Sequence, residues 1–293
     1  MKPAPFEYFA PASIEEALGL LQEHGEEAKV IAGGQSLVPM MNFRLVRPAC
    51  LIDINRIGGL SYITEQGGEL RIGAMTRQRA LEESPLLREK NGLLVEAARL
   101  IGHPATRSRG TVGGSVVHAD PTAELPVALS VLDGSIEVAG PGGSRTIGWR
   151  DLFLSYFTTT LEPGEICTEV RVPVLPSGAG WAFEEFTRRH GDFAIVGVAA
   201  VVELTPEGRC DGARLALAGG APTPLRAEAA ENFLQGKEMN DAVVAEAGQL
   251  AAGQVEAESD LHASGEYRRH LAAVMTRRAL TKALRRAGRG GQG

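Results

Sequence analysis

Two short glycine stretches decide the fold of this chain: Ile31-Ala32-Gly33-Gly34-Gln35-Ser36 and Thr111-Val112-Gly113-Gly114-Ser115. Each combines two consecutive glycines with hydroxyl side chains, and the first begins inside the segment Lys29-Val30-Ile31-Ala32, which predicts a short buried strand. Glycine lets the backbone turn through positive φ, and successive amides in such a turn form an anion-binding concavity. Two such loops that face each other could clamp a diphosphate without a lysine. The alternative interpretation is a pair of tight turns with only a structural role.

The other common phosphate-binding and nucleophile motifs do not fit this chain. A G-x-G-x-x-G occurs at Gly288, Gly290 and Gly293, but no helix follows it, so we expect no dinucleotide-binding role there. The only Gly-Lys pair, Gly236-Lys237, is followed by Glu238 rather than by Ser or Thr, so it is not part of a P-loop. The sequence contains no G-x-S-x-G elbow and no visible pairing of a nucleophile with a base. We therefore assign no catalytic residue.

The composition is that of a globular protein large enough for two domains. The chain has 293 residues, of which 44% are hydrophobic and 23% charged, and its formal net charge is −6. A mildly acidic chain lacks the basic footprint of a nucleic-acid-binding protein. No apolar run is long enough to span a membrane, and residues 1–7 lack the apolar core of a signal peptide, so we expect a cytoplasmic protein without a transmembrane segment.

The cysteines and histidines form no metal-binding pattern. Cys50, Cys167 and Cys210 are far apart in the sequence and form no C-x-x-C. Because an iron–sulfur cluster usually takes four thiolates, we do not expect one in this chain. The histidines are scattered and no H-E-x-x-H occurs, so we assign no metal site. Buried thiols in a reducing compartment explain the three cysteines.

Hydrophobic periodicity and turn residues outline an α+β organisation. Ser13 and Glu16 form a capping box, and the helix that they begin ends at Gly25. The segment 173–180 is the best linker candidate. Strands are expected at 29–32, 50–54, 70–74, 135–138, 169–172, 194–202 and 214–217, and further helices at about 76–87, 93–101, 125–132, 225–234, 241–251 and 263–286. The strands and then helices after the linker predict a separate α+β domain.

Two acids follow the second glycine stretch, in Asp120-Pro121-Thr122-Ala123-Glu124. A carboxylate here, Asp120 or Glu124, could accept a hydrogen bond from a ribose or ribityl hydroxyl. The same acids also suit a helix start, where the macrodipole favours negative charge. Both roles can hold together.

Three further side chains have two open interpretations each. Arg107 and Arg109 either neutralise a phosphate or lie solvated in a basic loop. Phe193 either stacks on a flat heterocycle or belongs to the core.

Three segments together resemble the FAD-binding medium subunits of the molybdenum hydroxylases, of the carbon monoxide dehydrogenase and xanthine dehydrogenase type. They are Ala32–Met41, Arg107–Ser115 with Asp120–Pro126, and Ala263–Arg269, so the resemblance covers almost the whole chain. It implies an α+β fold: a two-subdomain α/β FAD-binding domain (vanillyl-alcohol-oxidase-like, PCMH-type), followed by a C-terminal α+β domain like that of the CO dehydrogenase flavoprotein. The implied boundaries are 1–175, with subdomains of about 1–57 and 58–175, then 180–287, with a disordered tail at 288–293.

The resemblance also implies where FAD binds. The two glycine loops hold its diphosphate, Ile101 contacts the flavin nucleotide, and Ile166 is an apolar contact near the ring. Together with the residues chosen above for their chemistry, the candidate FAD-binding residues are Ile31, Ala32, Gly33, Gly34, Gln35, Ser36, Leu37, Ile101, Thr111, Gly113, Gly114, Ser115, Asp120, Glu124, Ile166 and Phe193.

The chain departs from the family pattern at two places. Ser115 stands where Asn is common, and its hydroxyl can still donate one hydrogen bond. Relatives often carry a Lys near Glu184-Glu185, where this chain has two acids. If that Lys stabilises charge on the reduced flavin, the potential or the choice of acceptor differs here.

The function that the resemblance implies is electron transfer within a larger complex. A molybdenum centre oxidises the substrate, and electrons pass through two 2Fe–2S clusters to FAD and on to NAD, oxygen, a quinone or a cytochrome. We expect FAD in this chain, molybdopterin on a large partner subunit and the clusters on a small iron–sulfur subunit, assembled as a dimer of heterotrimers. A stand-alone flavoprotein oxidoreductase of the same fold and a non-redox nucleotide-binding module are the alternatives.

Overall fold

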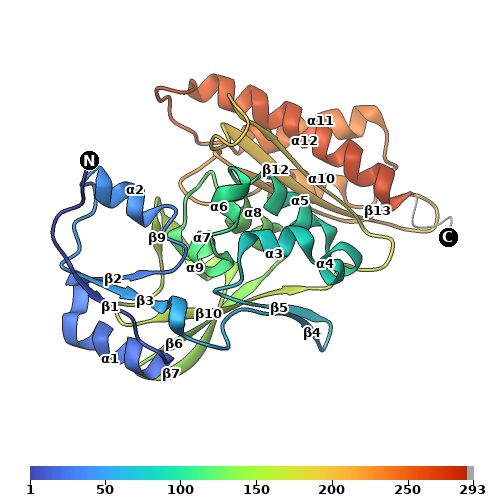
Figure 1. Ribbon diagram of the computed structural model, residues 1–293. Coiled ribbons are helices and arrows are strands. Elements are labelled where there is room, and N and C mark those ends of the chain that lie inside the picture. Colours follow the sequence, from blue (N-terminus) through green and yellow to red (C-terminus); the bar gives the residue numbers. More distant parts are fainter. Residues whose placement is uncertain (289–293) are drawn as a thin grey trace.

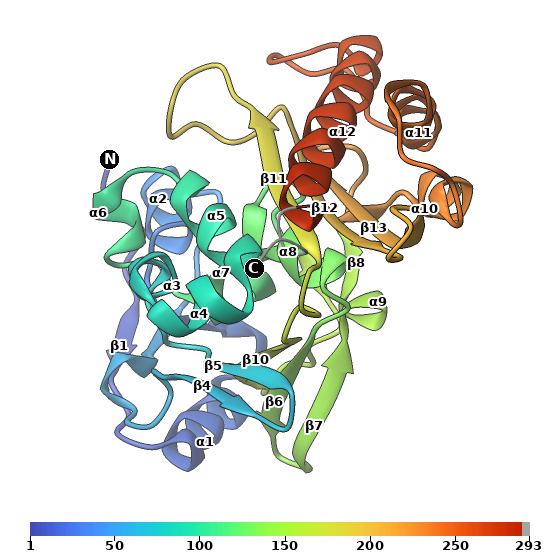
Figure 2. The same cartoon turned by 90° about the vertical axis from the view of Figure 1, so that its right-hand side faces the viewer.

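The computed structural model describes residues 1–288, which form three successive parts (Figures 1 and 2). The first part, blue in Figure 1, is a three-stranded parallel sheet in the order β1-β3-β2 with helices around it. Its elements are β1 (Glu7–Phe9), α1 (Ile14–His24), a 3-10 turn (Gly25–Glu27), β2 (Ala28–Ile31), α2 (Leu37–Asn42), β3 (Cys50–Asp53) and a second 3-10 turn (Ile54–Arg56).

The sequence explains how α1 begins, packs and ends. The Ser13 hydroxyl accepts a hydrogen bond from the Glu16 amide at 3.2 Å, as the capping box predicts, but the Glu16 carboxylate accepts from the Ala12 amide instead of from Ser13. Ala17 and Leu21 are the buried positions of the helix, and they pack in one core with the strand residues. Gly25, at φ +55°, ends the helix.

The second part is a five-stranded antiparallel sheet in the order β4-β5-β10-β6-β7, with helices on one side. Its strands are β4 (Ile63–Gln66), β5 (Glu69–Gly73), β6 (Ser135–Gly140), β7 (Gly143–Gly148) and β10 (Ile166–Pro173), and a small hairpin pairs β8 (Phe153–Ser155) with β9 (Thr158–Thr159). Its helices are α3 (Gln78–Glu83), α4 (Pro85–Lys90), α5 (Gly92–Leu100), α6 (Pro104–Arg107), α7 (Val112–His118), α8 (Glu124–Val131) and α9 (Trp149–Leu152).

The third part is a four-stranded antiparallel sheet covered on its outer face by helices, orange and red in Figure 1. Its elements are β11 (Gly180–Phe186), β12 (Val196–Leu204), β13 (Cys210–Ala218), β14 (Leu225–Arg226), α10 (Glu228–Leu234), α11 (Asp241–Gly253) and α12 (Gly265–Ala287). In β12, Ala199 and Val201 pack in the core of the second part, whereas Val198 and Ala200 pack under the outer helices. The sheet is therefore buried on both faces, which explains its nearly continuous apolar run.

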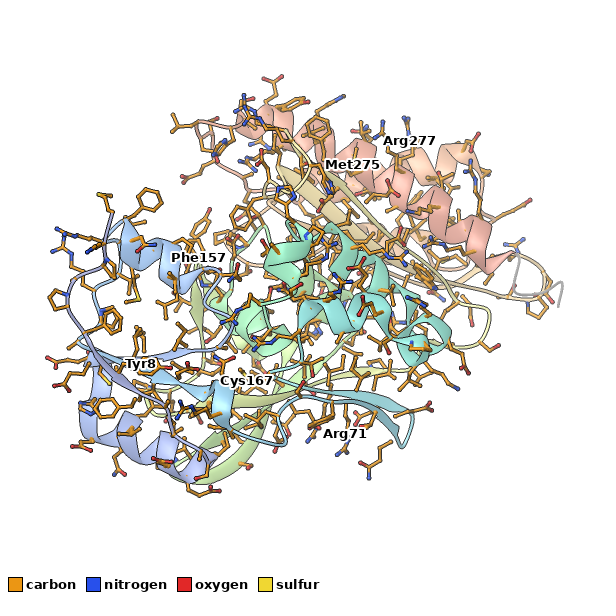
Figure 3. The ribbon with its side chains drawn as sticks, viewed as in Figure 1. Tyr8, Arg71, Phe157, Cys167, Met275 and Arg277 are labelled. Carbon is orange, nitrogen blue, oxygen red and sulfur yellow. The ribbon has the colours of Figure 1, made fainter. Side chains whose placement is uncertain are left out.

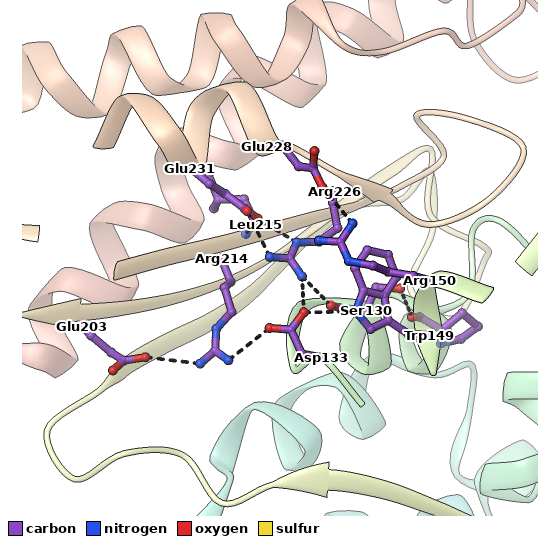
Figure 4. A network of polar contacts seen from close by, with 11 residues as sticks. Ser130, Asp133, Trp149, Arg150, Glu203, Arg214, Leu215, Arg226, Glu228 and Glu231 are labelled. Atoms are coloured by element: carbon purple, nitrogen blue, oxygen red, sulfur yellow. Dashed lines mark hydrogen bonds and ion pairs between the residues drawn. The ribbon is translucent and has the colours of Figure 1, made fainter. Parts of the chain in front are cut away.

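Polar contacts tie the third part to the second (Figure 4). The buried guanidinium of Arg226 donates to the Ser130 carbonyl at 2.9 Å and to Asp133 Oδ1 at 2.7 Å, and it also pairs with Glu231. At the other end of the interface, Lys282 and Arg286 of α12 bind Glu96 of α5. The two parts thus share both an apolar core and partly buried ion pairs.

The structure corrects two of the expected elements. The helix expected at 76–87 is two helices, because Ser84 leaves the helical conformation ahead of Pro85 and caps α4 through its hydroxyl. The helix expected at 225–234 starts only at Glu228, since Leu225 and Arg226 pair with β13. Except for Gly288, the tail for which disorder was expected lies outside the described residues. Over the part of the chain that the structure describes, no helix is long and apolar enough to cross a membrane.

Candidate functional site

Both glycine stretches line a single cleft of about 770 Å³, where the three parts meet. That volume is typical of a cofactor site. The approach of the two stretches is close: a Cβ on Gly33 would lie 2.4 Å from the Arg109 carbonyl oxygen, just ahead of the second stretch. A Cβ on Gly114 would lie 3.8 Å from the Ala32 side chain. Glycine at position 33 is therefore required for the two segments to meet.

The first glycine stretch carries unpaired backbone amides. After β2 ends at Ile31, Gly34 turns at φ +71°, and within the described residues the amides of 33–36 donate no turn or loop hydrogen bond. The carbonyls of the same stretch are engaged, because Ala32 accepts from Asn55 Nδ2 at 2.7 Å and Gly33 accepts from Gln35 Nε2 at 3.2 Å. Free amides and engaged carbonyls make this wall of the cleft suited to an anion.

The second glycine stretch is a helix start rather than a second concavity of free amides. The Val112 and Gly113 amides donate to the carbonyls of Thr76 and Ala74, both at 2.9 Å. The Gly114 amide donates to the Thr111 hydroxyl at 3.2 Å, so Thr111 is the N-cap of α7. The expectation of two equivalent nests is wrong for this half, since the amides are already used. What Gly113 and Gly114 contribute to the cleft is a wall without side chains.

Asn55 and Arg77, which sequence reasoning missed, join the two stretches. Asn55 holds the Ala32 carbonyl, and its Oδ1 accepts from Arg77 Nη2 at 2.7 Å. Arg77 Nη1 in turn donates to the Arg109 carbonyl at 2.5 Å. Neither residue belongs to a recognisable motif, and only the parallel pairing of β2 with β3 brings Asn55 beside the first stretch.

The two acids after α7 differ in their surroundings. Asp120 Oδ1 accepts from the amide and the hydroxyl of Thr122, at 2.8 and 2.6 Å, and so stabilises the turn that leads into α8. Glu124 is the first residue of α8 and is buried, and both acids line the cleft. Burial, followed by the charge of Glu185, raises the pKa of Glu124 to about 8. Glu124 is therefore largely a neutral acid at pH 7, unlike the carboxylate acceptor that the sequence suggested.

The apolar candidates surround the same space. Ile101, Ile166 and Leu37 line the cleft, as does Phe193, whose side chain is 68% exposed. The interpretation of Phe193 as a core residue is therefore wrong. Ile31 does not line the cleft; it lines a smaller hollow of about 320 Å³ beside the first stretch, together with Arg109. The remaining candidates all line the cleft: Ala32, Gly33, Gly34, Gln35, Ser36, Thr111, Gly113, Gly114, Ser115, Asp120 and Glu124.

Both interpretations of Arg107 are wrong. Its side chain is buried, and it donates to Glu82 and to the Ile101 carbonyl, each at 3.0 Å. It therefore neither faces a phosphate nor lies in solvent. Instead it fixes the loop that carries Ile101 to the cleft.

His118 and Phe157 are further cleft residues that the sequence did not indicate. Phe157 comes from the turn of the β8–β9 hairpin and lies between the first part and the central helices (Figure 3). It adopts φ +53°, its amide donates to the Ala119 carbonyl at 3.1 Å, and its ring lies 5.2 Å from that of His118. Burial lowers the pKa of His118, which favours the neutral imidazole. The hairpin brings these residues together from distant sequence positions.

Comparison with known proteins agrees with this architecture. The family "FAD binding domain in molybdopterin dehydrogenase" matches residues 4–175, and the family "CO dehydrogenase flavoprotein C-terminal domain" matches residues 181–283. The 6-hydroxypseudooxynicotine dehydrogenase complex subunit alpha of Paenarthrobacter nicotinovorans is 44% identical, over 98% of this chain and 97% of that protein. The carbon monoxide dehydrogenase medium chain of Hydrogenophaga pseudoflava is 40% identical, over 98% and 99%. A solved structure of carbon monoxide dehydrogenase from the same organism superimposes with a TM-score of 0.95 at 42% identity, covering 98% of this chain and 99% of that chain.

Fold and cleft together define a flavoprotein of the two-subdomain FAD-binding type. The chain belongs to the family of FAD-binding medium subunits of the molybdenum hydroxylases, of the carbon monoxide dehydrogenase and xanthine dehydrogenase type. The resemblance found in the sequence, the expected α+β fold and the assignment as an FAD-binding oxidoreductase subunit are confirmed. The cleft fits FAD, because free amides, a wall without side chains and apolar residues meet in one space.

Proposed function

We propose that this chain holds one FAD in the cleft and passes electrons to it from iron–sulfur clusters on a small partner subunit, then onward to NAD, oxygen, a quinone or a cytochrome. The observation that carries this proposal is the row of four free amides at 33–36, set opposite the bare start of α7 in one cleft. When bound, FAD supplies the redox chemistry, and the chain supplies binding, orientation and electrostatics.

The residues divide between the two ends of the cofactor by their chemistry. The amides from Gly33 to Ser36 and the hydroxyls of Thr111 and Ser115 suit the diphosphate. The apolar group of Ile101, Ile166, Phe157 and Phe193 suits the flat ring system. Arg109 is exposed and lines the smaller hollow beside the first stretch, together with Asp53.

The substrate is oxidised elsewhere in the assembly. Cys50, Cys167 and Cys210 are all buried and free, and within residues 1–288 no group of three metal-ligating side chains occurs. In this proposal the clusters and molybdopterin belong to partner chains, a small and a large subunit, in a dimer of heterotrimers. Support comes from the relatives, one named as a medium chain and one as a subunit of a dehydrogenase complex. Reduced buried thiols fit a cytoplasmic complex.

The test compares FAD binding by the full chain and by two glycine variants. Gly34→Ala places a Cβ at φ +71°, 3.2 Å from Val38, and should distort the free amides and weaken FAD binding by about tenfold or more. Gly142→Ala is the matched control, since nothing lies within 4 Å of its new Cβ. A wild-type chain that binds no FAD would refute the proposal.

Purification of the native complex tests the partner assignment. We expect molybdenum, iron and two further chains to co-purify with this subunit, and we expect reduction of its flavin by substrate to require them. Substrate turnover by this chain alone would establish the stand-alone flavoprotein instead. A folded chain that binds nucleotides other than FAD, without flavin, would establish the non-redox module.

A further inference from the structure

Gln78, which belongs to none of the glycine stretches, lies in the wall of the FAD cleft with its carboxamide oxygen unpaired. It is the first residue of α3 and is only 5% exposed. Its Oε1 is buried and has no hydrogen-bond partner among the described residues. Because burying a polar atom without a partner costs free energy, native structures keep few such atoms. The fold alone therefore does not explain why a glutamine stands here.

Packing holds the Gln78 side chain against the segment that leads into the second glycine stretch. The Gln78 backbone amide donates to the Gly110 carbonyl at 3.0 Å. A Cβ on Gly110 would lie 2.4 Å from Gln78 Oε1 and 3.1 Å from its Nε2, so the carboxamide packs directly on Gly110. A Cβ on Gly33 would lie 2.8 Å from the Gly110 Cα. Gly110 thus contacts both residues, which brings the carboxamide close to the free amides of the first stretch.

The nitrogen is the end of the carboxamide that is open to the cleft. Oε1 is buried, whereas Nε2 is neither a donor to another described residue nor one of the fully buried atoms. Since Gln78 lines the cleft, its accessible Nε2 is available to a ligand there. A buried amide that serves the fold is bonded differently: Asn91 Nδ2 donates to the Pro173 carbonyl at 3.2 Å.

A side-chain donor at this place supplies what the second glycine stretch lacks. The amides of Val112, Gly113 and Gly114 already donate to protein oxygens, so this wall offers no backbone donor from them. The free amides of 33–36 belong to the opposite wall. An anion gripped from both sides therefore needs a donor such as Gln78 next to α7.

We propose that Gln78 is a further FAD-binding residue, whose Nε2 donates a hydrogen bond to the diphosphate. This inference rests on the proposed function. A carboxamide nitrogen only donates, which suits a phosphate oxygen, and a hydrogen bond to a charged acceptor is stronger than one between neutral groups. Because packing on Gly110 already fixes the side chain, little rotamer freedom is lost when the ligand binds.

The experiment measures the dissociation constants of FAD and of ADP for the full chain by isothermal titration. In Gln78→Met, which keeps the length of the side chain but removes its amide, we expect the affinity for FAD to fall by about tenfold. The affinity for ADP should fall by a similar factor, because ADP contains the diphosphate without the flavin. Gln66→Met is the matched control: Gln66 is exposed on β4, outside the cleft lining, and its variant should bind both ligands like the wild type.

The stability of the cofactor-free chain separates this role from a structural one. Gln78→Met removes the buried Oε1 that has no partner, so the urea concentration at the unfolding midpoint should stay the same or rise. Gln78→Glu replaces the donor with a carboxylate and should weaken FAD binding further than Gln78→Met does. It also decides the question if Gln78→Met does not fold.

Three results would overturn the inference: wild-type FAD affinity in Gln78→Met, a loss of FAD affinity without a loss of ADP affinity, or wild-type FAD affinity in Gln78→Glu. The second of these would place the contact of Gln78 on the flavin half of the cofactor. The third would mean that the side chain accepts a hydrogen bond instead of donating one. A wild-type chain that binds no FAD would instead contradict the proposed function.

Discussion

Arg77 Nη2 donates to Asn55 Oδ1 at 2.7 Å, and this one contact connects the two glycine stretches. Asn55 holds the Ala32 carbonyl of the first stretch, and Arg77 holds the Arg109 carbonyl just before the second. The side chains of Asn55 and Arg77 thus hold the two walls of the cleft in position relative to each other. A binding site made of backbone needs such supports, because loop amides cannot be oriented by their own side chains.

Replacing Arg77 should loosen the cleft without unfolding the chain. Arg77→Met frees the Arg109 carbonyl and leaves Asn55 without its donor, and we expect FAD affinity to fall by about tenfold. Arg79→Met, two residues further along the chain, removes only an exposed pair with Glu83 and should change affinity less than twofold. Isothermal titration with FAD measures both. Equal affinities in the two variants would mean that the loops hold their positions without Arg77.

The buried Arg226 should dominate the stability of the interface between the second and third parts (Figure 4). Arg226→Met leaves Glu231 and Asp133 without their shared cation, and we expect a loss of about 3 kcal/mol in the free energy of unfolding. Arg150→Met breaks the exposed pair with Glu228 and should cost less than about 1 kcal/mol. Urea unfolding measures the difference. A cost as small for Arg226 as for Arg150 would contradict the assigned role.

The exposed ring of Phe193 should contribute to cofactor binding and not to folding. Phe193→Ala removes a side chain of a residue that is 68% exposed, so we expect the free energy of unfolding to stay within about 0.5 kcal/mol of the wild type. FAD affinity should fall by about fivefold through lost contact with the ring system. Phe43→Ala, at a ring 66% exposed outside the cleft lining, is the control for both measurements. A loss of stability in Phe193→Ala without a change in FAD affinity would show that Phe193 has a structural role and does not bind the cofactor.

Local sequence patterns predicted most of the helices and strands but not the hydrogen bonds that build the cleft. The capping box at Ser13 and the apolar run of β12 follow from short-range rules, and the structure has both. The second glycine stretch was misinterpreted because the partners of its amides, such as the Ala74 and Thr76 carbonyls, come from a segment that only the fold brings there. Arg107 was misplaced for a similar reason, since its acceptors Glu82 and Ile101 reach it through packing.

The pH dependence of stability provides a test of the buried acid that needs no cofactor. The folded-state pKa of Glu124 is raised from 4.5 to about 8, so between those values the folded chain binds more protons than the unfolded chain. The contribution of Glu124 to the free energy of unfolding is therefore present at low pH. It is lost as the pH rises through this window, by up to about 1.4 kcal/mol per pH unit. Glu185, with its pKa raised to about 7 by burial, adds a loss of the same sign.

Glu124→Gln should remove the larger part of this slope. We expect the urea concentration at the unfolding midpoint of the wild type to decrease as the pH is raised from about 5.5 to about 8. The midpoint of the variant should decrease less, so that the two curves diverge with rising pH. Glu184→Gln serves as the control, because Glu184 is paired with Lys282 and belongs to the other face of β11. Parallel curves for wild type and Glu124→Gln would show that Glu124 ionises near its ordinary pKa, and the carboxyl would then face FAD as an anion.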